Sequence, residues 1–217
     1  MLFIVFKREK AILVISRISP SKNIENVLEI GKVLKESHDM NHFEININGS
    51  IIVEDKNYAQ NLNNLILQYN LENNIKISPN VSFQELQEQV KESKLWIHPT
   101  PEEPFGISIV EALSAGLIPI VPDNGGATEF VPPQYQYRTI EDASNMIYKI
   151  LKNINSKYDG KIEIEKQKIK KLANKFSKQK FNENVTRVIE SILENNTFSD
   201  SLSSQSFVVL NHPVIIE

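Results

Sequence analysis

Short apolar segments alternate with amphipathic helical segments along most of the 217-residue chain. The apolar segments are typical of strands buried on both faces of a sheet, and the segments between them carry apolar residues on one helical face. The predicted strands are 11–16, 43–48, 75–78, 95–98, 117–121 and 135–138. The predicted helices are 24–34, 55–70, 82–92, 107–115 and 140–153. This alternation predicts an α/β fold with a doubly wound parallel sheet of the Rossmann-like kind.

The segment that leads into the helix at 107–115 predicts a ligand site. A loop rich in Pro and Glu (101–104) runs directly into Phe105 and Gly106. The first amides of a helix have no partner within the helix and lie at the positive end of its dipole. We therefore expect the N–H groups of Phe105, Gly106 and Ile107 to bind a phosphate. Gly106 lets the ligand come close because it has no Cβ.

Glu111 lies within an apolar part of the same helix, so we expect its carboxylate to be buried. Such a carboxylate is costly unless it is paired or hydrogen-bonded, and two sugar hydroxyls would be suitable partners. The helix should end at Gly116, where a left-handed cap costs glycine little. Pro119 in the next strand predicts an edge strand or an irregularity. The turn with Gly125 and Gly126 follows that strand and should face the same crevice.

Two cations flank the first strand-to-helix turn. Arg17 and Lys22 can bind a diphosphate, the guanidinium through two bonds and the ammonium as a point charge. The alternative is a pair of solvated loop cations. Gly49 ends the next strand at the same presumed ligand edge. His98 also ends a strand near the site; we expect it to be packed or solvated, with a structural hydrogen bond to the loop as the alternative.

Glu103 and Glu111 are separated by seven residues. This E-x7-E spacing within EPFGISIVEALSAGLIPIV, followed by GGATEFV, resembles the donor-binding domain of retaining GT-B glycosyltransferases of family 4, the glycosyl transferases group 1. The resemblance covers residues 11–193 and implies one half of a GT-B fold. The amino-terminal half that binds the acceptor in such enzymes is missing from this chain.

The resemblance also implies a role for each matching residue. Arg17 and Lys22 match the family's R-x4-K pair and would neutralise the diphosphate, Glu103 would contact sugar hydroxyls, and Glu111 would hold the ribose. The candidate catalytic residues are thus Glu103, Arg17 and Lys22, and relatives need no metal. Glu129 matches an acidic position of the family and would either contact ligand or cap a short helix. The candidate donor-binding residues are Arg17, Lys22, Gly49, Glu103, Phe105, Gly106, Ile107, Glu111, Gly125 and Gly126.

The expected substrate is a nucleotide diphosphate sugar, with no further cofactor. The segment from His98 to Val131 looks most like mannosyltransferases of glycolipid and lipid-linked oligosaccharide assembly, which favours GDP-mannose and a glycan or lipid-linked acceptor. A UDP-sugar is the alternative, because Ser78, Pro79 and Asn80 replace the aromatic residue and glycine that relatives carry beside the base.

Two other functions remain open from the sequence. One is a non-catalytic nucleotide- or sugar-binding module that acts with a partner chain, since the binding residues would be the same. The other, ranked last, is a sugar-nucleotide epimerase of the same fold, which would not be expected to carry E-x7-E in this context.

Composition bounds the location and partners. The chain has no Cys, a formal charge of −3 and no apolar run that could span a bilayer, so we expect a cytoplasmic protein with no nucleic-acid partner. With no Cys and only four His residues, we expect no metal site. A lysine-rich helical run (161–180) is either a solvated face or a peripheral contact with an anionic membrane. The predicted divisions are an N-terminal stub (1–10), a nucleotide-sugar-binding domain (11–155), C-terminal helices (156–194), and a linker and tail (195–217).

Overall fold

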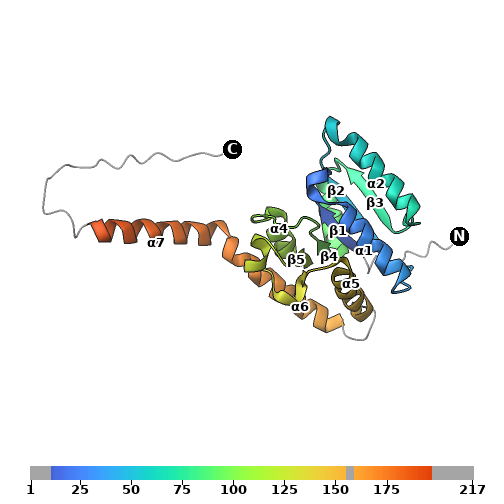
Figure 1. Ribbon diagram of the computed structural model, residues 1–217. Coiled ribbons are helices and arrows are strands. Elements are labelled where there is room, and N and C mark those ends of the chain that lie inside the picture. Colours follow the sequence, from blue (N-terminus) through green and yellow to red (C-terminus); the bar gives the residue numbers. More distant parts are fainter. Residues whose placement is uncertain (1–10, 155–158, 197–217) are drawn as a thin grey trace. The chain divides into compact units, whose positions relative to one another are not determined.

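The computed structural model describes residues 11–154 and 159–196, with side chains in 11–152 and 163–193. The chain divides into two compact units, one ending at Lys175 and one beginning at Phe176. The first unit holds the sheet and its helices, and the second holds helix α7, Lys178–Asn196 (Figure 1). The predicted stub at 1–10 and nearly all of the predicted tail lie outside the described residues.

Six parallel strands form the sheet in the order β3-β2-β1-β4-β5-β6. This confirms the predicted doubly wound parallel sheet. The strands are β1 Ala11–Ile15, β2 Glu44–Gly49, β3 Ile75–Pro79, β4 Ser93–Ile97, β5 Ile118–Pro122 and β6 Gln136–Tyr137. The first strand is buried because Ala11, Ile12, Leu13 and Val14 pack into the layers of helices on both faces.

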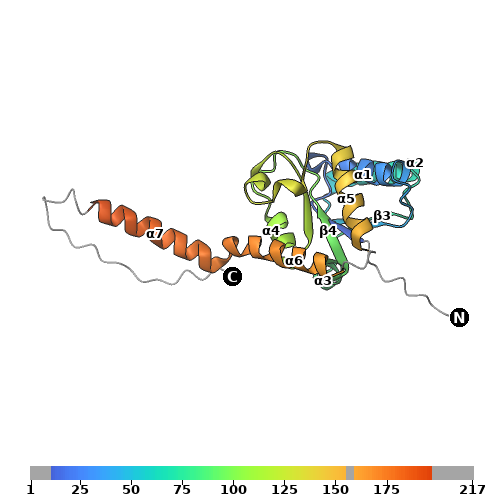
Figure 2. The ribbon, with the colours of Figure 1, turned by 90° about the horizontal axis from the view of Figure 1, so that it is seen from below.

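Two layers of helices cover the sheet, as Figure 2 shows. Helices α1, α2 and α5 lie on one face, where α1 packs against α5. Helices α3, α4 and α6 lie on the other, where α4 packs against α6. Their bounds are α1 Glu25–Glu36, α2 Lys56–Gln68, α3 Phe83–Glu92, α4 Ile107–Ala115, α5 Ile140–Ile154 and α6 Asp159–Ala173. Short 3-10 helices lie at Pro20–Lys22, Val53–Asp55, Gly126–Glu129, Pro133–Tyr135 and Asn174–Phe176.

The edge strand that Pro119 predicts is not observed. β5 lies between β4 and β6 and is buried along its whole length. The amide of His98 donates to the carbonyl of Ile120 at 2.9 Å, so Ile120 faces β4 and Pro119 faces the other way. On that side β6 pairs only with Val121 and Pro122. Pro119 is tolerated inside the sheet because β6 does not extend to it.

Side chains and glycine cap the helices that lead to and from the site. The hydroxyl of Ser82 accepts from the amide of Glu85 at 3.1 Å and starts α3. Gly116 ends α4 with φ 80°, as predicted.

Helix α6 is part of the first unit, where Ile169 and Ala173 are buried. The predicted division at residue 155 stays a prediction. The two compact units meet between Lys175 and Phe176, so α6 belongs to the first unit and α7 to the second. Among the helices in the described ranges, none combines the length and apolar character needed to cross a membrane.

Candidate functional site

The strand order places a cavity where β1 and β4 lie side by side. The chain continues from β1 toward one edge of the sheet and from β4 toward the other, so the loops after these strands diverge. A cavity of about 600 Å³ opens there. It is lined by Ile15, Ser16, Arg17, Lys22, Gly49, Ser50, His98, Glu103, Pro104, Phe105, Gly106, Ile107 and Ser108. Seven of the ten predicted donor-binding residues are therefore brought together.

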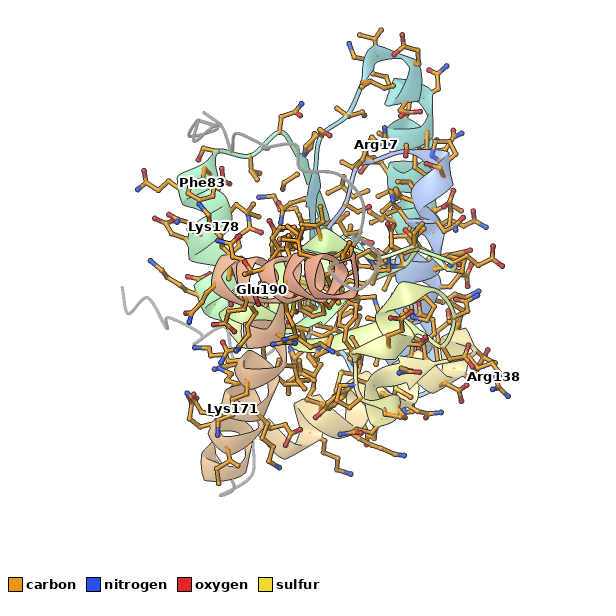
Figure 3. All side chains as sticks on the ribbon, turned by 90° about the vertical axis from the view of Figure 1, so that its left-hand side faces the viewer. Arg17, Phe83, Arg138, Lys171, Lys178 and Glu190 are labelled. Atoms are coloured by element: carbon orange, nitrogen blue, oxygen red, sulfur yellow. The ribbon has the colours of Figure 1, made fainter. Side chains whose placement is uncertain are left out.

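The predicted cations both line this cavity, but their surroundings differ. Lys22 donates to the Glu103 carboxylate with an Nζ–Oε2 distance of 2.8 Å, and both side chains are partly buried. Arg17 follows β1 and is exposed (Figure 3). It forms no ion pair with another residue in the part of the chain that the structure describes. Its guanidinium is thus available to an anion, while Lys22 already has an anionic partner.

His98 lies at the end of β4 and reaches the cavity from the interior. Its side chain is only 4% exposed, and Nε2 lies 3.8 Å from Oε2 of Glu103. Burial lowers the pKa of His98 to about 4, an effect that Glu103 opposes and Lys22 reinforces. The imidazole is therefore neutral at pH 7. Trp96 stacks against the ring with centroids 5.4 Å apart, and the Tyr137 hydroxyl donates to the His98 carbonyl at 3.0 Å.

The start of α4 supplies backbone donors to the cavity. Gly106 precedes the helix with φ 81°, a left-handed conformation that favours glycine. In the described part of the chain, the amides of Gly106, Ile107 and Ser108 donate to no other protein group. These amides can receive an anion at the positive end of the helix dipole. Phe105 is held beside them by Phe130, with ring centroids 5.6 Å apart.

Gly125 and Gly126 support the loop that carries Glu103. The amide of Gly126 donates to the Glu103 carbonyl at 2.8 Å. A Cβ at Gly126 would lie 1.9 Å from the Pro104 carbonyl oxygen, and one at Gly125 would lie 2.7 Å from that of Glu103. The two glycines thus allow close backbone packing behind the loop, and their predicted contact with the donor stays a prediction.

Gly49 has a similar packing role, although it also lines the cavity. A Cβ there would lie 1.7 Å from the carbonyl oxygen of Ser16. Since Ser16 precedes Arg17, this close approach fixes the direction in which the chain leaves β1.

The expectation that Glu111 is buried is wrong, because its side chain is exposed on α4. The apolar residues around it in sequence point to other sides of the helix, and Ile109, Ala112 and Leu113 are the ones buried. Glu111 follows Ile107 by one helical turn, so it lies on the same side of α4 as that cavity residue. Glu129 is also exposed. Neither carboxylate lines the cavity.

Three serines of the cavity are not predicted from the sequence. Ser16 and Ser50 directly follow β1 and β2, and Ser108 is in the first turn of α4. Their places at strand ends and a helix start are a signal that could have found them. His98 is packed, as expected, but nothing local in its sequence indicates its distance from Glu103. Within the described side chains, His, Asp and Glu form no group of three or more that could hold a metal ion.

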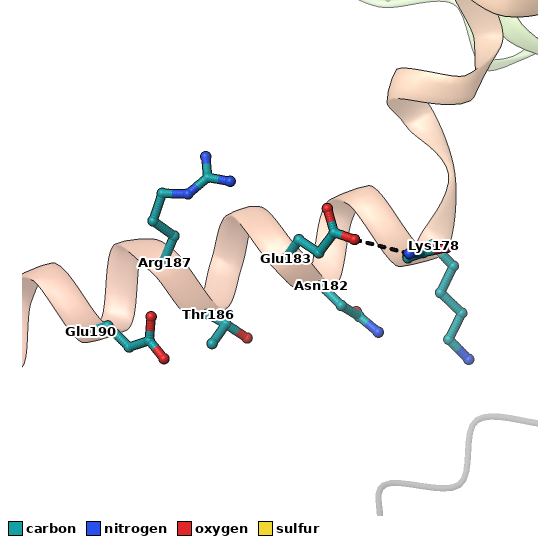
Figure 4. A pocket seen from close by; sticks show the side chains of 7 residues that line it. Lys178, Asn182, Glu183, Thr186, Arg187 and Glu190 are labelled. Atoms are coloured by element: carbon teal, nitrogen blue, oxygen red, sulfur yellow. Dashed lines mark hydrogen bonds between the residues drawn. The ribbon is translucent and has the colours of Figure 1, made fainter.

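A second hollow lies on helix α7 alone (Figure 4). Polar side chains from Lys178 to Glu190 line it, and the side-chain amide of Gln179 donates to the Glu183 carboxylate at 2.9 Å. Because one helix supplies every lining residue, the described residues do not enclose a ligand there.

Comparison with known proteins identifies the family. A model of the family "Glycosyl transferases group 1" matches residues 4–157. A Dictyostelium discoideum protein, "GDP-Man:Man(3)GlcNAc(2)-PP-Dol alpha-1,2-mannosyltransferase", is 25% identical over 209 residues, which cover 91% of this chain and 40% of that protein.

Solved structures share the fold. TarM from S. aureus, in complex with UDP among other ligands, superposes with a TM-score of 0.69 at 22% identity, covering 84% of this chain and 36% of TarM. Anabaena HepE in complex with UDP and glucose gives 0.69 at 20% identity, covering 85% of this chain and 49% of HepE. The chain thus spans less than half the length of these relatives. Since the family model matches more than half of its residues, the chain belongs to the glycosyl transferases group 1.

Proposed function

We propose that this chain is the donor-binding half of a retaining glycosyltransferase of family 4. It would transfer a hexose from a nucleotide diphosphate sugar to a glycan or a lipid-linked acceptor. The observation that carries the proposal is the cavity between the ends of β1 and β4, which gathers Arg17, Lys22, Glu103 and the first amides of α4. Cations and helix amides suit a diphosphate, and a carboxylate suits sugar hydroxyls.

The same arrangement would favour the chemical step. When the bond between the sugar and the diphosphate breaks, negative charge builds on the leaving phosphate. Arg17, Lys22 and the amides of Gly106 and Ile107 would stabilise that charge without having to reorganise. Glu103 would hold the sugar through its hydroxyls, and Glu111, which is exposed one turn along α4, would be accessible to the ribose.

GDP-mannose is the favoured donor. The Dictyostelium relative carries GDP-Man in its name, whereas the TarM and HepE structures contain UDP. A UDP-sugar is therefore the alternative. The acceptor would be bound by an amino-terminal GT-B domain, and the chain's 40% coverage of the mannosyltransferase relative leaves room for such a domain there.

Calorimetric titration of the chain with GDP, UDP and ADP, with and without magnesium, tests the donor site. We expect one nucleotide to bind selectively and magnesium to make little difference. Arg17→Ala should weaken binding about 10-fold or more, because a charged hydrogen bond to phosphate is lost. Arg187→Ala, on α7, is the matched control and should leave binding unchanged. Wild-type chain that binds none of the three nucleotides would contradict the proposal.

The role of Glu111 has its own test. Glu111→Ala should abolish detectable donor binding if the carboxylate holds the ribose, whereas Glu129→Ala should change affinity little if that residue only caps a short helix. Unchanged affinity in Glu111→Ala would refute the assigned role.

If the chain binds donor but shows no transfer once joined to an acceptor domain, it is the non-catalytic binding module instead.

A further inference from the structure

Among the described residues, the buried imidazole of His98 has no hydrogen-bond partner. Both ring nitrogens are enclosed, and neither Nδ1 nor Nε2 bonds to another group among the described residues. Buried polar atoms are nearly always hydrogen-bonded, and an unpaired one lowers stability. The backbone around His98 is nevertheless well fixed, since its amide bonds to Ile120 and its carbonyl to Tyr137. The ring is thus held in place with its bonding capacity unused.

The Glu103 carboxylate is the charged acceptor next to that ring. Oε2 lies 3.8 Å from Nε2 of His98, just beyond hydrogen-bond distance, and 2.8 Å from Nζ of Lys22. The carboxylate therefore lies between a cation that it bonds and an imidazole that it does not. A shift of about 1 Å would bring it within the usual 2.7–3.2 Å of a ring N–H.

Lys22 is also the cation that the proposed function assigns to the diphosphate. An ammonium that turns to a phosphate leaves its carboxylate partner partly buried and unpaired, which is unfavourable. A neutral imidazole can replace it, because it carries one N–H and needs an acceptor. Glu103 and Lys22 are the charged groups that act on the pKa of His98, and the exchange is between these two side chains and the imidazole.

We propose that His98 is a positioning residue that takes over Glu103 from Lys22 when a donor binds. In the free chain Lys22 bonds Glu103. With a diphosphate present, Lys22 turns to the phosphate, and the Nε2–H of His98 donates to Glu103 and fixes its carboxylate for the sugar hydroxyls. This inference rests on the proposed function, from which it takes the ligand.

The exchange can be tested without ligand by NMR of the chain labelled with ¹⁵N in its histidines. Lys22→Met removes the competing cation, so a low-field, exchange-protected Nε2–H signal of His98 should appear that the wild-type chain lacks. The double variant Lys22→Met with Glu103→Ala should lose that signal. Identical His98 signals in the single and double variants would overturn the proposal.

Binding measurements supply the second arm. His98→Phe keeps a ring of similar size but removes the N–H. It should weaken nucleoside diphosphate binding about 10-fold, because Lys22 then leaves Glu103 without a partner, and weaken nucleotide-sugar binding less, because the sugar hydroxyls can also bond to Glu103. His98→Gln, which retains an N–H donor, should recover part of the loss, and His42→Phe is the control. An equal loss for both ligands in His98→Phe would contradict the proposal.

The two arms separate the possible failures. If the wild-type chain binds no nucleotide, the proposed function fails, and the NMR comparison still decides whether Glu103 moves to His98. If nucleotides bind but the His98 signal does not depend on Lys22, the donor site stands and the partner exchange is wrong.

Discussion

At the scale of single residues, Gly126 has no room for a side chain. A Cβ would lie 1.9 Å from the Pro104 carbonyl oxygen. The backbone fixes the positions of both atoms, so neither can turn aside. We expect Gly126→Ala to lower the free energy of unfolding by about 1–3 kcal/mol and to displace the loop that carries Glu103. Urea denaturation measures the first effect.

Gly31→Ala is the matched control for Gly126→Ala. Its Cβ would lie 2.7 Å from Cδ1 of Ile75, the mobile end of a side chain, and alanine favours the α1 helix by about 1 kcal/mol over glycine. The free energy of unfolding should therefore stay within about 1 kcal/mol of wild type. A Gly126→Ala chain as stable as this control would contradict the close packing behind the loop.

His98 should make stability depend on pH. The folded chain keeps the ring neutral down to a pKa of about 4, while in the unfolded chain its pKa is near 6.5. Between these values the unfolded state binds a proton that the folded state does not, so stability falls as pH falls. From pH 7 to pH 5 the contribution of His98 should drop by about 2 kcal/mol.

Urea denaturation of wild type and His98→Phe at both pH values isolates this effect, because other titrating groups are common to the two chains. From pH 7 to pH 5, the free energy of unfolding of wild type should fall by that amount relative to that of His98→Phe. A difference that is independent of pH would show that the His98 ring is not kept neutral by burial.

At the scale of elements, α6 should be needed for the sheet unit. Ile169 and Ala173 are buried, and the Tyr135 hydroxyl donates to Glu165 of α6 at 2.6 Å. A chain that ends at Lys175 should melt close to the full chain, whereas one that ends at Ile154 should melt at a clearly lower temperature. Circular dichroism checks both. Equal melting temperatures for the two truncations would contradict the role of α6.

The elements themselves follow closely from the sequence, because strand and helix periodicity is local. Residues 11–16 predict β1, which spans Ala11–Ile15, and 107–115 match α4. The predictions that fail are those that depend on residues distant in the sequence. Glu111 has apolar neighbours in sequence but is exposed on α4, and Pro119 is tolerated because β6 is short. The distance between His98 and Glu103 requires two loops to be placed in space, which no periodicity encodes.

At the scale of the whole molecule, α7 presents an unburied apolar row. Phe181, Val188 and Ile192 are each more than half exposed. We expect the 217-residue chain to self-associate through this row as its concentration rises. Sedimentation velocity should show self-association of the wild-type chain and much less of it for the double variant Val188→Lys and Ile192→Lys.

The α7 substitutions should leave the melting temperature of the sheet unit unchanged, since they lie in the second unit. Substitution of Lys180 by Gln is the control for altered charge on the same helix. Equal association of wild type and the double lysine variant would contradict the assignment of this row as an interface.

The bond between Lys22 and Glu103 also bears on which anions the cavity can bind. A free phosphate or sulfate ion offers Lys22 a new partner but leaves Glu103 with only the neutral His98 ring in place of a cation, so the exchange gains little. A nucleotide sugar offers both at once, oxygens for the ammonium and hydroxyls for the carboxylate. We therefore expect the salt bridge to act as a selectivity device, so that a nucleotide sugar competes better for the cavity than a free phosphate or sulfate ion does.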